Sequence, residues 1–98
     1  MKLTIEFGGG LEALVKNGQK TLQVDLQRDE MTVQELIEYI AETFIVSRQN
    51  LFYNVDLSKL KPGILVLIND CDWELKGASQ AVVQNEDVIS FISTLHGG

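Results

Sequence analysis

The chain has a single cysteine, a single histidine and no long apolar run. The lone cysteine, Cys71, excludes an internal disulfide and suits a reducing compartment. The longest apolar run, Ile64 to Ile68, is far too short to cross a bilayer. Residues 1–7 alternate in polarity, so we expect no signal peptide and no membrane anchor. These absences predict a protein of the cytoplasm, with the nucleus as a second compartment.

Basic residues are also scarce: eight Lys and Arg stand against fourteen Asp and Glu, for a net charge of −6. This charge repels phosphates, so we predict no direct binding to nucleic acid, and it favours a partner with a basic docking face. One histidine and one cysteine cannot supply a nucleophile, a base and their orienting groups. We therefore predict that the chain is not an enzyme. Gly8-Gly9-Gly10 lacks the Lys-Ser/Thr of a phosphate-binding loop, so we interpret it as a plain loop.

The 98 residues suffice for one domain. Alternating polarity predicts half-buried strands at 2–7 and 21–26, separated by a loop with a turn at Asn17-Gly18. The apolar run at 64–68 predicts a strand that is covered on both faces or paired centrally. We expect a short strand at Trp73–Leu75, with Trp73 as a packing residue, and a last strand at Val88–Leu95. Residues 47–63 are predicted to be irregular, with a short helical turn near Gln49–Phe52.

One amphipathic helix is predicted after residue 32. Thr32 followed by Glu35 matches a capping box, in which each residue satisfies a backbone N–H of the other. The apolar positions then recur at helical spacing and form one stripe: Val33, Leu36, Ile37, Ile40, Ala41 and Phe44. We expect this stripe to pack on a sheet.

The element order is strand, strand, helix, strand, short strand, strand. This order predicts an α+β fold of the β-grasp, or ubiquitin-like, class, with a mixed sheet packed against one main helix over residues 1–98. In that fold the first and last strands are parallel neighbours at the sheet centre. The last strand then leads into a flexible, reactive tail at 95–98. Gly97 and Gly98 have no Cβ, so this tail is thin enough to enter a narrow enzyme channel.

Four segments of the chain resemble the eukaryotic ubiquitin-related modifier family, the sulfur-carrier relatives of ubiquitin. The terminal octet is the most specific of the four, whereas residues 11–60 resemble the family in element order more than in sequence. The matching segments are Glu6 to Gly10, Pro62 to Asp70, Asp72 to Leu75, and Phe91 to Gly98.

The resemblance implies a carrier whose own C-terminus is the reacting group. A ubiquitin-activating-like enzyme with sulfurtransferase activity adenylates Gly98 with ATP, and a persulfide donor converts it to a thiocarboxylate. The sulfur then passes to a tRNA thiolation complex that makes 2-thiouridine at the wobble position. Members are also joined to lysines of target proteins. Leu95, His96 and Gly97 are implied as the tail that the activating enzyme recognises, and the carrier itself holds no cofactor and no metal.

A noncovalent ubiquitin-like adaptor is the alternative interpretation. Its sheet would bind a partner while its tail stayed idle. The bare diglycine end favours the carrier, because an adaptor has no need of it. Cys71 lies between Asp70 and Asp72, and we interpret it as structural or incidental.

Overall fold

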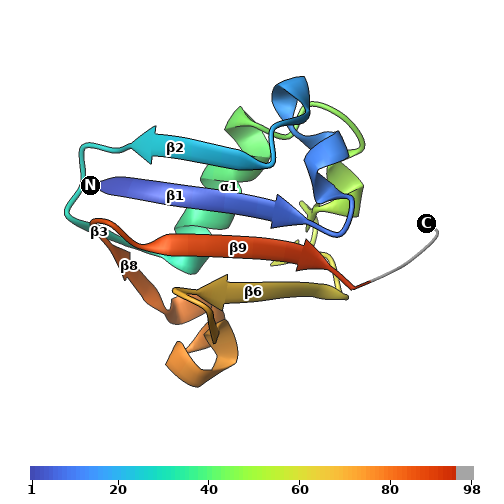
Figure 1. The fold of residues 1–98 in the computed structure, drawn as a ribbon. Coiled ribbons are helices and arrows are strands. Elements are labelled where there is room, and N and C mark those ends of the chain that lie inside the picture. The colour runs from blue at the N-terminus through green and yellow to red at the C-terminus, as the bar shows by residue number, and fades with distance from the viewer. Residues whose placement is uncertain (95–98) are drawn as a thin grey trace.

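A computed structural model of the chain describes residues 1–94. Within this range the chain begins and ends on a strand and contains one α-helix (Figure 1). Five short 3-10 helices, labelled η, lie in the connections of this part of the chain. The bounds are β1 Lys2–Gly8, η1 Leu11–Leu14, η2 Lys16–Gly18, β2 Thr21–Asp25, β3 Glu30–Thr32, α1 Val33–Thr43, η3 Gln49–Leu51, β4 Tyr53–Asn54, β5 Lys59–Leu60, β6 Ile64–Ile68, β7 Cys71–Asp72, η4 Trp73–Lys76, η5 Ala78–Gln80, β8 Val82–Gln84 and β9 Val88–Ser93.

The main sheet has five strands in the order β2-β1-β9-β6-β7. Strands β1 and β9 run parallel, with Ile5 opposite Ile89 and Phe7 opposite Phe91, whereas the other pairs are antiparallel. The first and last strands are therefore central neighbours in a mixed sheet. This topology confirms the predicted β-grasp fold.

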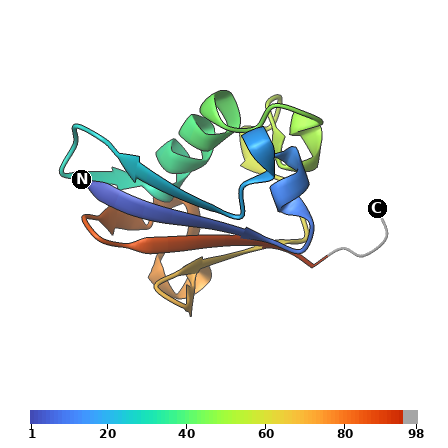
Figure 2. The ribbon, with the colours of Figure 1, turned by 45° about the horizontal axis from the view of Figure 1, so that its top comes forward.

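The core lies between this sheet and α1, which crosses one face of it (Figure 2). The helix stripe is confirmed, because Val33, Leu36, Ile37 and Ile40 are fully buried. From the other side, alternate strand residues point to the helix, as the two-residue period of a strand requires. Three rings, Phe7, Phe52 and Phe91, pack on one another with centroids 5.5 to 6.4 Å apart.

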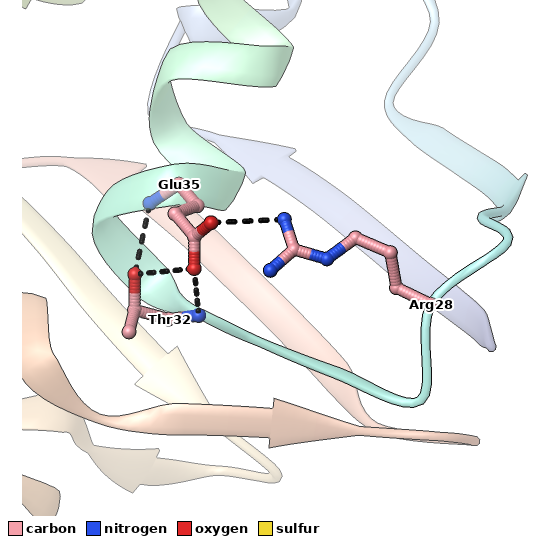
Figure 3. Close-up of polar contacts among 3 residues, drawn as sticks. All are labelled: Arg28, Thr32 and Glu35. Atoms are coloured by element: carbon pink, nitrogen blue, oxygen red, sulfur yellow. Dashed lines mark hydrogen bonds and ion pairs between the residues drawn. The ribbon is translucent and has the colours of Figure 1, made fainter.

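The start of α1 is fixed by the predicted capping box (Figure 3). The Glu35 N–H donates to Thr32 Oγ1 at 3.2 Å, and Glu35 Oε1 accepts from the Thr32 N–H at 3.0 Å. Arg28 Nη1 donates to the other carboxylate oxygen of Glu35 at 2.9 Å. The Arg28 hydrogen bond, with the Thr32 backbone bond second, lowers the pKa of Glu35 below its ordinary value.

The predicted strand at 73–75 is wrong. Residues Trp73–Lys76 form η4, and the strand comes just before them as β7. Asp72 caps this turn by accepting the Glu74 N–H at 3.0 Å, and Gly77 ends it at φ 107°. Trp73 packs against the core while partly exposed, as expected of a packing residue.

The predicted irregular segments contain more structure than expected. The loop after β1 holds η1 and η2, and the segment 47–63 holds the β4–β5 hairpin as well as η3, which confirms the helical turn there. A second small sheet, β3 with β8, was not predicted. The last strand begins at Val88 as expected, but it ends at Ser93 and not at the predicted Leu95.

Candidate functional site

The residues predicted to carry function begin one residue beyond the last strand, after Thr94. Leu95, His96, Gly97 and Gly98 lie outside the described residues, and so does the expectation that 95–98 form a flexible tail. The structure therefore describes the support from which they continue. We call the end of this support, Ser93 and Thr94 with their neighbours Gly9 and Gly63, the tail root.

On one side, the tail root is bonded to the turn before β6. The last rung of the β6–β9 ladder pairs Ile64 with Ser93. Thr94 then adds two hydrogen bonds to one acceptor: its N–H and its Oγ1 donate to the Gly63 carbonyl at 2.8 Å and 2.6 Å. Gly63 holds φ at 94° in a turn that closes from Ile64 N–H to the Lys61 carbonyl. This left-handed conformation is one that glycine adopts without a steric penalty.

On the other side, the tail root touches the glycines that come after β1. Gly9 has φ 67°, and a Cβ built on it would lie 2.2 Å from the Ser93 carbonyl oxygen. No side chain fits there, because real Cβ contacts essentially never fall below 3.0 Å. Gly8-Gly9-Gly10 thus does more than form the predicted loop: it lets the end of β1 approach the end of β9.

The acceptor turn is itself attached to the core. The Lys61 N–H donates to the Phe52 carbonyl at 2.8 Å. The fully buried Phe52 ring meets Phe91 of β9 edge-on, with centroids 5.5 Å apart. The turn and β9 are therefore tied to the same buried aromatic cluster, so the tail root has a rigid base.

The outer face of the sheet continues from the tail root. Leu65 and Leu67 alternate with the buried Val66 and Ile68, so they point away from α1. Ile92 of β9 is the cross-strand partner of Leu65 and lies on the same face. All three are half-buried. In Figure 1 this face is turned toward the viewer, and no described element lies in front of β1 and β9.

The described residues offer little catalytic chemistry. Cys71 is exposed, and His96 lies beyond the part that the structure describes. Within residues 1–94 no group of three or more His, Cys, Asp and Glu could hold a metal ion. In the same range no helix is long and apolar enough to cross a membrane.

The sequence predicts a tail at 95–98, but it did not reveal the contacts of the tail root. Thr94, Gly63 and Gly9 come from three distant segments, and only the sheet topology brings them together. Two sequence features could have indicated the tail root: the Pro62-Gly63 turn and the glycine run after the first strand. Each predicts an unusual backbone conformation, but neither shows which segment lies next to it.

A five-stranded mixed sheet packed against one helix, with the first and last strands as central neighbours, defines a ubiquitin-like fold. The comparisons with known proteins narrow this class. The sequence signature described as Urm1 (Ubiquitin related modifier) matches residues 2–98. The chain therefore belongs to the ubiquitin-related modifier family.

Individual relatives are similar to this chain over its whole length. Ubiquitin-related modifier 1 homolog 1 of Arabidopsis thaliana is 44% identical over 103 residues, which covers all of both chains. The Chlamydomonas reinhardtii homolog is 46% identical over 101 residues, covering 100% of this chain and 99% of the relative. The solution structure of Urm1 from Trypanosoma brucei superimposes with a TM-score of 0.84 at 36% identity, covering 99% and 95% of the two chains. Membership makes this chain a ubiquitin-like modifier or sulfur carrier and not an enzyme.

Proposed function

We propose that the Gly98 carboxylate of this chain is the group that an activating enzyme charges. A carboxylate oxygen attacks the α-phosphorus of ATP, pyrophosphate leaves, and the acyl-adenylate forms. The terminal sulfur of an enzyme persulfide then attacks the acyl carbon and AMP leaves. A thiol cleaves the resulting S–S bond, which leaves a thiocarboxylate on Gly98 and a disulfide on the enzyme side.

Adenylation is needed because a free carboxylate is anionic at neutral pH and a poor electrophile. The carrier contributes no acid or base to these steps, and its part is to present Gly98. The observation that carries the proposal is the Gly97-Gly98 pair, which two residues separate from the hydrogen-bonded tail root, in a chain of this family. ATP and the persulfide belong to the enzyme, and the carrier holds no cofactor.

The activating enzyme docks on the outer face of the sheet in this proposal. The half-buried Leu65, Leu67 and Ile92 lie on that face, and Ile92 is two residues from Thr94. An enzyme that covers them has the tail root at the edge of its footprint. The net charge of −6 favours a basic docking surface on the enzyme. Leu95, His96 and Gly97 then cross the enzyme's channel to the ATP site.

Downstream, the thiocarboxylate donates its sulfur to a tRNA thiolation complex for 2-thiolation of the wobble uridine. The activated Gly98 is also joined to lysines of target proteins. Both roles belong to the cytoplasm or nucleus. The carrier does not touch nucleic acid directly, since its charge opposes phosphate.

The test is the intact mass of the chain after incubation with its activating enzyme, ATP and a sulfur donor. We expect the mass difference of sulfur replacing oxygen, located on Gly98 by fragmentation. A variant that lacks Gly97 and Gly98 is the control and should keep its mass. An unchanged mass of the full chain, with an enzyme shown to be active on another carrier, would favour the noncovalent adaptor instead.

A further inference from the structure

Thr94 makes a bond that the fold does not require. Its backbone N–H already extends the β6–β9 ladder by one step beyond the Ile64–Ser93 rung. The side-chain hydroxyl adds a second, shorter bond to the same Gly63 carbonyl at 2.6 Å. The residue is exposed and buries no apolar surface of consequence. The hydroxyl bond therefore fixes the position of Thr94 and adds little to the stability of the domain.

The position of this bond matters because Thr94 is the last residue before the tail. Four residues, Leu95 to Gly98, follow the tail root, and a chain of four residues spans at most about 14 Å when fully extended. The reach of the Gly98 carboxylate from the docking face is therefore set by the position and direction of Thr94. A rotation of the Thr94 backbone changes the direction in which the chain leaves the sheet.

The two bonds restrict that rotation. Both donors of Thr94 end on one acceptor, so the side chain is held in a single χ1 rotamer. β-branching already makes the χ1 angle of threonine stiff, and the N–H bond to Gly63 holds the backbone of Thr94 beside β6. The acceptor cannot drift either, because the Gly63 turn is bonded to Phe52 in the core.

We propose that Thr94 is a positioning residue for activation: its hydroxyl, bonded to Gly63, sets the direction in which residues 95–98 enter the adenylation site. The inference rests on the proposed function. Docking through the outer face of the sheet determines how tightly the enzyme binds the carrier. Thr94 acts afterwards, on the geometry between the Gly98 carboxylate and the α-phosphate of ATP. Loss of the hydroxyl should thus lower kcat and leave KM almost unchanged.

The experiment compares Thr94→Val, Thr94→Ser and wild type as substrates in ATP–pyrophosphate exchange with the activating enzyme. Valine keeps the shape and the N–H bond but removes the hydroxyl, whereas serine restores it. We expect Thr94→Val to lose about fivefold in kcat, the equivalent of one modest hydrogen bond, with KM within twofold. Thr94→Ser should recover most of the rate. Thr43→Val, the same change at an exposed position of α1, is the matched control and should behave as wild type.

Each outcome has one meaning. A normal kcat for Thr94→Val, a loss confined to KM, or a failure of Thr94→Ser to recover the rate would each overturn the positioning role. Melting curves should show Thr94→Val as stable as Thr43→Val within a few degrees, so that unfolding does not explain the result. If wild type itself supports no exchange with a demonstrably active enzyme, the proposed function fails and not merely the role of Thr94.

Discussion

Gly9 and Gly10 form a natural pair for testing the close packing at the tail root. Both have positive φ, 67° and 96°, and both precede the same 3-10 helix. They differ in their surroundings. A Cβ on Gly9 would meet the Ser93 backbone, whereas a Cβ on Gly10 would have nothing within 4 Å. Alanine at either position introduces backbone strain, but only Gly9→Ala also introduces a clash.

The expected losses come from these two effects. An L-residue held at positive φ costs about 1–2 kcal/mol, and this is the whole expected loss for Gly10→Ala. The Cβ of Gly9→Ala would stand 2.2 Å from the Ser93 oxygen and 3.0 Å from its carbonyl carbon. Ordinary contacts lie near 3.5–4.0 Å, so one backbone must move by more than about 1 Å. Such overpacking adds about 1–3 kcal/mol, for a total of about 2–5 kcal/mol.

The atoms around Gly9 cannot easily move to relieve this clash. The clash partner is backbone, so no side chain can swing away. Ser93 is held by its rung with Ile64, and Thr94 next to it by Gly63. On the other strand, Gly8 is paired with Ile92. Relaxation therefore has to break ladder bonds at one end of the central strand pair.

Urea unfolding of the two variants measures the difference. We expect both midpoints to fall without a change in slope, and Gly9→Ala to fall by more. Because about 1 kcal/mol shifts the melting temperature of a domain of this size by about 4–8 °C, thermal melts should separate the variants clearly. Equal losses, or a larger loss for Gly10→Ala, would show that the approach of Gly9 to Ser93 is not as close as the structure has it.

Four further predictions test the core, the helix cap, the docking face and the cysteine. Ile40→Ala should cost about 2–5 kcal/mol in urea unfolding, because Ile40 is fully buried under the sheet. The Arg28 hydrogen bond, followed by the Thr32 backbone bond, lowers the pKa of Glu35, so its contribution to stability is complete above the ordinary pKa of a glutamate and is lost as the pH falls through the lower folded pKa. Unfolding midpoints of wild type should therefore decline with acid more steeply than those of Glu35→Gln, and parallel curves would contradict this. Leu65→Gln should raise the KM for activation several-fold without unfolding the domain, while Leu57→Gln, the same change at a 64% exposed site beside α1, should not. Cys71→Ala should give the wild-type yield of thiocarboxylate, since the sulfur is carried on the chain end; a collapsed yield from folded protein would make Cys71 part of the sulfur path.

The regular elements were predictable because each has one buried face. Residues 2–7 and 21–26 alternate, and the helix repeats with its own period, so polarity alone reveals β1, β2 and α1. The capping box located the first residue of the helix to within one residue. These signals also fixed the order of elements, on which the β-grasp topology rests.

The missed elements are too short to carry a period. Strands β4 and β5 have two residues each, and β3 and β8 have three. The error at 73–75 has a different cause: alternating polarity over three residues fits a strand and a helical turn equally well. The side chain of Asp72 decides between them by capping the Glu74 N–H, and sequence spacing does not show that bond.

The apolar run from Ile64 to Ile68 carries a signal for function as well as for structure. Five apolar residues in a row predicted a strand covered on both faces or paired centrally, and β6 is indeed flanked by β9 and β7. Val66 and Ile68 account for one face, since they are buried against the core. Leu65 and Leu67 have no such partner in α1, because they point to the outer face, and the fold alone does not require them to be apolar. A strand that is apolar on its open face breaks the usual alternation, and such local exceptions concentrate at functional sites. Leu65 and Leu67 lie near Ile92, and thus near the tail root. We therefore assign these two residues to docking of the activating enzyme and not to the core.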